Sequence, residues 1–349
     1  MKDNINKNHA NSHNSQTVVF PGKIAVMGGG SWATSLAKIL LYSQPSINWY
    51  MRRPDRIEDF KRMKHNPAYL SSISFDTSRI FFYSDINKAI EESDTLIFAT
   101  PSPYLKEHLK KVAVSLQHKY IISAIKGIVP DENLLISDYF AKYYGVHPNN
   151  IIVITGACHA EEIAMEHLSY ITLVCNDLRK AEKLSERVFN TPYLNSSSSR
   201  DRIGLEYVSV LKNIYAIVAG ICSGLKYGDN FQAVYVPNAF DEMFRFLDVV
   251  HPIKRNITSA SYLSDLLVTA YSSFSRNRMF GKMIGEGYSV GVAKIELGMV
   301  AEGYYATKCI HEINETYQVD MPILNAIYSI LYKREPAVEQ IKKITETFK

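Results

Sequence analysis

The stretch KIAVMGGGSWA, residues 23–33, decides the fold of this chain. The apolar run Lys23–Met27 predicts a buried strand, and the helical pattern of Ser31–Tyr42 predicts a helix that begins directly after three glycines. A strand, a glycine-rich loop and a helix in this order are the context that a phosphate-binding loop requires.

The loop itself fits the pattern G-x-G-x-x-G/A. Gly28 allows a tight turn, Gly30 lets the backbone approach a pyrophosphate, and Ala33 keeps the helix close to the strand. Ser31 and Trp32 open the helix, whose N-terminus presents free N–H groups and a partial positive charge. We therefore predict dinucleotide binding here; the alternative is a turn that serves only close packing.

The end of the next predicted strand bears on the choice of cofactor. An acidic residue about 20 residues past the glycines would bind the ribose hydroxyls of NAD. This chain has Arg52 and Arg53 there, and a guanidinium matches a 2′-phosphate. The pattern favours NADPH, although Asp55 leaves use of NAD open. The alternative is that both arginines lie on a solvated loop.

Further short apolar runs continue the α/β pattern. The strands expected after the first are Ile47–Tyr50, Thr95–Thr100, Tyr120–Ser123, Ile151–Ile154 and Tyr170–Val174. Their spacing leaves room for crossover helices, which predicts a parallel sheet of Rossmann type.

The pattern changes at residues 196–200 (SSSSR), which we interpret as a linker or loop. Beyond it, long helical periodicity is expected over Asp201–Ala219, Phe231–Val250, Thr258–Tyr271 and Ile295–Val319. We predict a disordered tail over residues 1–20, a Rossmann-type N-terminal domain over 21–195 and an all-α C-terminal domain over 196–349.

The composition excludes several classes of protein. The 349 residues carry a net charge of +4 with 46% hydrophobic residues, so nothing favours nucleic acid as a partner. Lys212 and Asn213 interrupt the apolar segment Val208–Leu225, so a buried helix is expected rather than a membrane span. The four cysteines, Cys158, Cys175, Cys222 and Cys309, are far apart and show no metal-ligand spacing, which favours reduced thiols and a cytoplasmic location.

Six segments together resemble the NAD(P)-dependent glycerol-3-phosphate dehydrogenase family of bacteria. They are GGGSWATSLA from Gly28, AIKGI from Ala124, TGACHAEEIA from Thr155, LKNIYAIVAGICSGLKYGDN from Leu211, SDLLVTAYSSFSRNRMFG from Ser264 and VAEGY from Val300. The resemblance covers residue 23 to the C-terminus. It implies reduction of dihydroxyacetone phosphate to sn-glycerol 3-phosphate for glycerophospholipid synthesis, with NADP(H) or NAD(H) as cofactor, by a homodimer.

Reduction of a ketone leaves negative charge on the carbonyl oxygen, which a nearby acid or cation must neutralise. Lys212 is in an apolar helical stretch, where an ammonium is costly without a partner or a role. The resemblance implies that Lys212 transfers the proton and that Lys126 is a second active-site lysine, each lowering the pKa of the other. Asp265 could pair with Lys212. A snorkelling or ion-paired core lysine is the alternative for Lys212.

The resemblance and the local chemistry also give candidate binding residues. Those expected at the substrate are Lys126, Gly156, Cys158, Asn213, Asp265, Thr269, Ser275, Arg276 and Asn277. Those expected at the cofactor are Gly28, Gly30, Ser31, Trp32, Ala33, Arg52, Arg53, Lys126, Ala160, Arg276, Val300 and Glu302. Arg276 with its hydroxyl and amide neighbours matches the oxygens of a phosphate dianion.

Two segments depart from the family pattern. Cys158 and His159 stand where the family usually has Ser-Phe, and Asn238 stands where it often has Arg. These changes keep two alternatives open: a dehydrogenase for another small phosphorylated or acidic hydroxy compound, and a catalytically silent nucleotide-binding module. A catalytically silent module would be expected to lack at least one of Lys212, Lys126 and Asp265, and all three are present.

Overall fold

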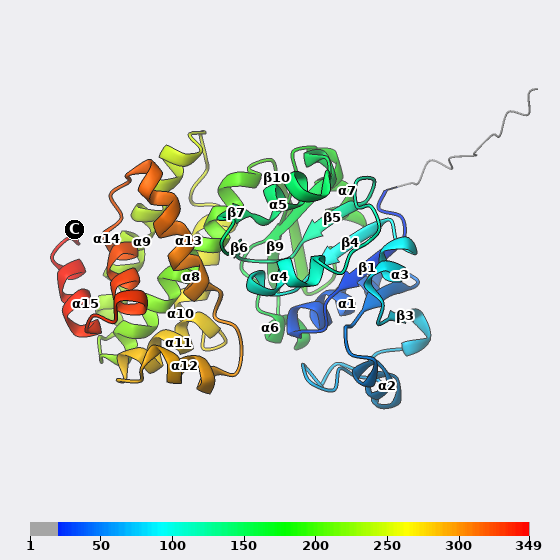
Figure 1. Cartoon of the computed structure of the whole chain (residues 1–349), viewed down its shortest axis with the longest axis horizontal. Coiled ribbons are helices and arrows are strands. Elements are labelled where there is room, and N and C mark those ends of the chain that lie inside the picture. The colour runs from blue at the N-terminus through cyan, green and yellow to red at the C-terminus, as the bar shows by residue number, and fades with distance from the viewer. Residues whose placement is uncertain (1–19, 349) are drawn as a thin grey trace, which may run out of the picture.

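The computed structural model describes residues 20–348 and has two parts, a sheet domain and a helical domain (Figure 1). The predicted tail, residues 1–20, lies outside the described residues except for Phe20, which is buried. The α/β N-terminal part followed by an all-α C-terminal part confirms the predicted fold class.

The sheet domain is built on eight strands in the order β10-β9-β8-β5-β4-β1-β2-β3. All neighbouring strands are parallel except the antiparallel pair β8–β9. The strands are β1 (Ile24–Met27), β2 (Ile47–Tyr50), β3 (Ile80–Tyr83), β4 (Thr95–Phe98), β5 (Tyr120–Ser123), β8 (Ile151–Thr155), β9 (Ser169–Val174) and β10 (Leu194–Ser199). A small hairpin of β6 (Ile128–Val129) and β7 (Leu134–Leu135) follows β5.

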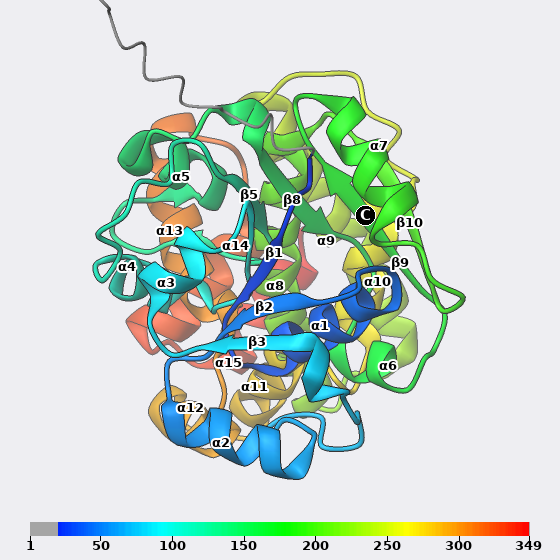
Figure 2. The ribbon, with the colours of Figure 1, turned by 90° about the vertical axis from the view of Figure 1, so that its right-hand side faces the viewer.

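Helices cover both faces of this sheet, as Figure 2 shows from the end of the molecule. They are α1 (Ser31–Ser43), α2 (Pro54–Met63), α3 (Ile86–Glu91), α4 (Ser102–Leu109), α5 (Ile136–Tyr144), α6 (Ala160–Ala164) and α7 (Leu178–Arg187). Within β1, Ile24 and Val26 pack into the core with α1, whereas Ala25 and Met27 pack into the core with α4 and α5. This alternation follows from the two-residue period of a strand.

The helical domain surrounds one long buried helix, α8 (Arg202–Gly224). The others are α9 (Asp229–Val250), α10 (Asp265–Tyr271), α11 (Arg276–Gly285), α12 (Val290–Leu297), α13 (Glu302–Tyr317), α14 (Pro322–Tyr328) and α15 (Ala337–Thr345). Among the described residues, α8 alone is long and apolar enough to cross a membrane, but its apolar window is wholly buried inside the protein, as expected for a core helix.

Close packing fixes α11 against α8. A Cβ at Gly281 would overlap the carbonyl oxygen of Ile217, and one at Gly220 would overlap that of Arg278. Two glycines therefore let the backbones of α8 and α11 approach each other, and this contact sets where the N-terminus of α11 lies.

Two local predictions were wrong. The serines of residues 196–199 do not form a loop but belong to β10, which pairs with β9, so the predicted domain boundary after residue 195 falls inside a strand. The helix predicted over Ile295–Val319 is broken into α12 and α13, because Gly298 ends α12 with φ at 62°.

Candidate active site

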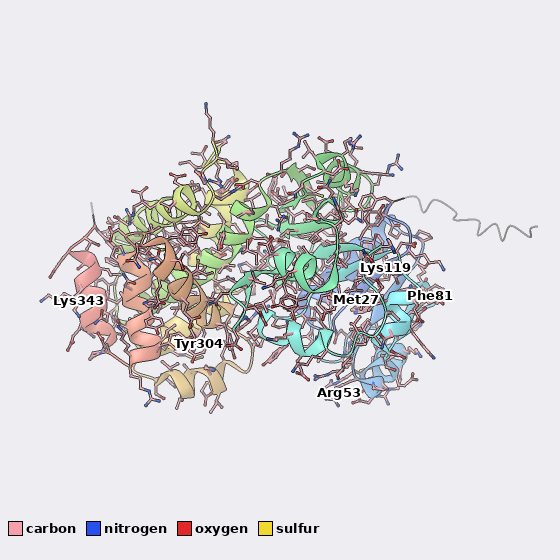
Figure 3. The ribbon with its side chains drawn as sticks, turned by 45° about the horizontal axis from the view of Figure 1, so that its top comes forward. Met27, Arg53, Phe81, Lys119, Tyr304 and Lys343 are labelled. Carbon is pink, nitrogen blue, oxygen red and sulfur yellow. The ribbon has the colours of Figure 1, made fainter. Side chains whose placement is uncertain are left out.

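A cleft of about 980 Å³ lies between the two domains. One wall is formed where β1, β2, β4 and β5 end, which is where open parallel sheets bind ligands. The other wall comes from α8, α10, α11 and residues 297–305. Two of the lining residues are labelled in Figure 3, Arg53 on the sheet domain and Tyr304 among the helices.

The glycine loop has the geometry that a pyrophosphate requires. Gly28 has φ at 141°, a backbone conformation that favours glycine, and its carbonyl oxygen accepts a 2.7 Å hydrogen bond from Trp49 Nε1. A Cβ at Gly30 would have nothing within 4 Å, and no side chain caps α1, so the helix N-terminus faces open space. Ala33 is fully buried beneath the loop rather than in the cleft.

The two arginines after β2 line the cleft but differ in their partners. Arg53 pairs with Asp55, with Nε 3.1 Å from Oδ1. Arg52 makes no hydrogen bond or ion pair with any residue in the range 20–348 and lines the cleft with His108. Burial, followed by repulsion from Arg52, lowers the pKa of His108. Arg52 is thus the better placed of the two for a ligand phosphate.

Lys212 and Asp265 form a buried ion pair in the wall of the cleft. Lys212, from α8, is 3% exposed, and Asp265, from α10, is fully buried. Burial lowers the pKa of Lys212 to about 8; the carboxylate of Asp265 opposes this effect, and the charge of Lys126 adds to it. An ammonium with this pKa exchanges its proton near neutral pH.

Lys126 follows β5 and has different partners. Its Nζ lies 3.1 Å from the carbonyl oxygen of Gly156 and 3.4 Å from Sγ of Cys158, with the Trp32 ring 5.7 Å away. Burial acts to lower the pKa of Lys126, but Cys158 and Asp265 outweigh it and the net pKa is raised. The expectation that both lysines have lowered pKa values was therefore wrong for Lys126, which stays a cation.

Amide side chains connect the two lysines with α11. Asn213 Nδ2 donates to the backbone oxygen of Lys126 at 2.7 Å, and Asn213 Oδ1 accepts from Asn277 Nδ2 at 2.9 Å. Asn277 Oδ1 in turn accepts from the Gly303 backbone at 2.9 Å. These hydrogen bonds connect the end of β5 in the sheet domain with α8, α11 and α13 in the helical domain, and so fix the relative position of the two walls of the cleft.

Arg276 is the first residue of α11 and faces the cleft. It makes no hydrogen bond or ion pair within the described residues, so its guanidinium is available to an anion. Ser275 caps the same helix by accepting from the Arg278 backbone at 3.3 Å. Thr269 donates to the backbone oxygen of Asp265 at 2.6 Å, which occupies its hydroxyl proton.

The segment that leads into α13 lines the cleft on the side of the helical domain. Glu302 accepts from the backbone and the hydroxyl of Ser102, at the start of α4. Burial raises the pKa of Glu302, and its bonds to Ser102 oppose that rise. Val300 lines the cleft beside it, and Ala160 lines it from the start of α6.

The structure brings nearly all the predicted site residues together. All of them line the cleft except Ala33 and Gly156, and Gly156 contributes its carbonyl oxygen to Lys126. Asn238, which departs from the family pattern, does not line the cleft, so its identity does not change the charge of the lining.

Sequence reasoning missed Asn66, which donates to the backbone oxygen of Gly29 at 3.1 Å and to Thr34 Oγ1 at 2.8 Å. It also left His159 unassigned, although the ring lines the cleft. Burial and then the two lysines lower the pKa of His159 to about 4, so the ring is neutral. Asn66 lies in no motif that could have indicated it.

A glycine loop at the carboxyl edge of a parallel sheet, facing a lysine–aspartate pair across a cleft, defines the class of two-domain, dinucleotide-binding dehydrogenases. The comparisons with known proteins agree. The models of the NAD-dependent glycerol-3-phosphate dehydrogenase N-terminus and C-terminus match residues 23–181 and 201–342. The chain belongs to this family.

The similar proteins cover almost the whole chain. The glycerol-3-phosphate dehydrogenase [NAD(P)+] of Chlorobium phaeobacteroides (strain BS1) is 33% identical over 321 residues, 91% of this chain and 96% of that protein. The enzyme of the same name from Bacillus subtilis (strain 168) is 31% identical and covers 91% and 93%. The crystal structure of glycerol-3-phosphate dehydrogenase from Coxiella burnetii has a TM-score of 0.85 at 27% identity, covering 93% and 98%.

Proposed function

We propose that the protein reduces dihydroxyacetone phosphate to sn-glycerol 3-phosphate with NADPH, and also with NADH, and that it supplies glycerophospholipid synthesis. The observation that carries the proposal is the buried pair of Lys212 and Asp265, which faces the glycine loop across the cleft. The names of the family and of its members support the substrate.

The residues present fit a dinucleotide. The space above Gly30 and the uncapped start of α1 suit a pyrophosphate, and Arg52 suits a 2′-phosphate. When bound, the reduced nicotinamide supplies a hydride to the carbonyl carbon of the substrate. Glu302 and Val300 flank that end of the cleft.

Each charged residue of the site has a separate task in this proposal. Arg276 binds the phosphate dianion of the substrate, because it is the cleft arginine at the start of α11 and makes no hydrogen bond or ion pair in residues 20–348, although its charge acts on Glu302. Lys126, whose raised pKa keeps it cationic, stabilises the negative charge that develops on the carbonyl oxygen.

Lys212 gives its proton to that oxygen, and Asp265 holds the ammonium in place. In the reverse direction the neutral Lys212 takes the proton from the hydroxyl of glycerol 3-phosphate. A pKa of about 8 makes both forms accessible near neutral pH.

The test is to follow the absorbance of NADPH and of NADH in parallel during addition of dihydroxyacetone phosphate. We expect oxidation of both, faster with NADPH, and a loss of at least one order of magnitude in kcat/KM with unphosphorylated dihydroxyacetone, since a charge-assisted bond is worth about 1.5–3 kcal/mol. Equal turnover of a 3-oxo acid, the oxidised form of a 3-hydroxy acid, or no turnover of dihydroxyacetone phosphate, would refute the proposal.

We propose further that the protein acts in the cytoplasm, as a homodimer. Support for the location comes from its four cysteines, all buried free thiols. The dimer follows from the family resemblance, and sedimentation of the purified protein tests it.

A further inference from the structure

A pair of buried hydroxyl groups lies next to the ion pair, outside the lining of the cleft. Thr155 ends β8 and Ser209 lies on α8, and their hydroxyl oxygens are 2.7 Å apart. Thr155 Oγ1 is also 3.4 Å from Oδ2 of Asp265, the carboxylate oxygen that Lys212 does not contact. Neither hydroxyl residue lines the cleft.

The donors and acceptors fix the direction of this chain of hydrogen bonds. A carboxylate only accepts, so Thr155 must donate its proton to Asp265. Thr155 then accepts from Ser209, which must donate. A serine inside a helix often donates to the carbonyl oxygen four residues back. Among the described residues the Ser209 hydroxyl has Thr155 as its hydrogen-bond partner, so its proton is available for this bond.

We propose that Thr155 and Ser209 are positioning residues for the reaction: they hold the Asp265 carboxylate from behind, so that its other oxygen stays aligned with Lys212. This inference rests on the function proposed above. The sheet domain supplies Thr155 and the helical domain supplies Ser209, Asp265 and Lys212, so the same contact connects the relative position of the domains with the proton donor.

The expected direction of the effect follows from charge. The titratable groups around Lys212 and Asp265 are Lys126, Cys158 and His159, and none of them bonds to Oδ2 of Asp265. Loss of the Thr155 hydrogen bond leaves more negative charge on the carboxylate, which attracts the Lys212 proton more strongly. Lys212 then gives up its proton less readily, and the carboxylate is free to turn out of alignment.

A second hydroxyl pair provides a matched control. Thr172 on β9 and Ser261 are also buried, also 2.7 Å apart and also join a strand to the helical domain. Thr172 lies opposite Thr155 in the β8–β9 pair, but within the described residues neither control hydroxyl makes a hydrogen bond to Lys212 or Asp265. The test compares Thr155→Val and Ser209→Ala with Thr172→Val and Ser261→Ala. Thermal unfolding of all four variants corrects for general loss of stability.

For Thr155→Val we expect kcat for dihydroxyacetone phosphate to fall about tenfold, the equivalent of one hydrogen bond to a charged group, with KM changed less than about twofold. The alkaline limb of the kcat profile should move up by roughly half a pH unit. Ser209→Ala should change both quantities in the same direction and less. The control pair should change neither.

Competitive labelling with acetic anhydride, read by peptide mass spectrometry, gives the pKa of Lys212 in each variant without any turnover. This measurement separates the inference from the proposed function. A wild-type protein that does not reduce dihydroxyacetone phosphate would refute the proposed function. The pKa of Lys212 in the variants would still show whether the Thr155 and Ser209 hydroxyls act on the ion pair. If Thr155→Val changes the Lys212 pKa and kcat no more than Thr172→Val does, or raises only KM, Thr155 and Ser209 are not positioning residues.

Discussion

The substitution Lys212→Met tests the centre of the site most directly, because methionine keeps an unbranched stem and removes only the ammonium. Asp265, which is fully buried, then loses its counter-charge. Removing one partner of a buried ion pair typically costs about 3–5 kcal/mol of unfolding free energy. Lys126 still attracts Asp265 and Thr155 still donates to it, so we expect a loss of about 3 kcal/mol, the lower end of that range.

The same change should reduce kcat by roughly 10²–10⁴-fold, the usual contribution of a positioned general acid. Affinity for NADPH should change less than about twofold, because no cofactor phosphate is expected near Lys212. Steady-state NADPH absorbance, urea unfolding followed by circular dichroism and fluorescence titration with NADPH measure the three quantities.

The double variant Lys212→Met/Asp265→Asn separates stability from chemistry. Removing both charges should recover most of the lost unfolding free energy, since the unpaired buried carboxylate causes the loss. It should recover none of the rate, since the proton donor is still missing. A single variant with near-normal kcat, or a double variant no more stable than Lys212→Met, would refute the roles assigned to this pair.

Three further predictions follow from other parts of the cleft. Arg276→Ala should raise KM for dihydroxyacetone phosphate by at least tenfold, from a bond worth about 1.5–3 kcal/mol, and leave the slow turnover of dihydroxyacetone unchanged; equal losses with both substrates would place the phosphate elsewhere. Arg52→Ala should weaken NADPH by at least fivefold more than NADH in fluorescence titrations, because only NADPH carries the 2′-phosphate; equal weakening would reject that assignment. The kcat for ketone reduction should fall above about pH 8 as Lys212 loses its proton, and the kcat for alcohol oxidation should rise through the same range; a reduction rate that stays constant up to pH 10 would show that another group donates.

The fold was predictable from the sequence where a strand is a short, continuous apolar run. The runs Ile47–Tyr50 and Tyr120–Ser123 are strands with those bounds because their side chains are buried on both faces. The strand β10 was not predictable, because four consecutive serines carry no apolar period. It forms because β9 offers an unpaired edge and Leu194 is fully buried at its start. Whether such a segment forms a strand therefore depends on the neighbouring strand with which it pairs, rather than on its own composition.

The candidate site shows the same division between local and distant information. Short sequence motifs indicated Lys212, Asp265 and Arg276, because each residue lies within a continuous segment that can be compared directly with the family pattern. No single segment contains the contacts that set their chemistry: Lys126 meets the Gly156 carbonyl, and Thr155 reaches Asp265 across 110 residues of chain.

Those contacts explain why two lysines of the same cleft differ. An isolated pair of ammonium groups would repel each other's protons equally, and the sequence alone predicts that symmetry. The fold breaks it by giving Lys126 a backbone carbonyl and a sulfur atom, and Lys212 a carboxylate in a fully buried setting. Burial is the largest influence on both pKa values and acts to lower each. The charge of Lys126 lowers the pKa of Lys212 further and Asp265 opposes this, whereas Cys158 and Asp265 raise the pKa of Lys126. The chemistry of the site thus depends on which strand end faces which helix.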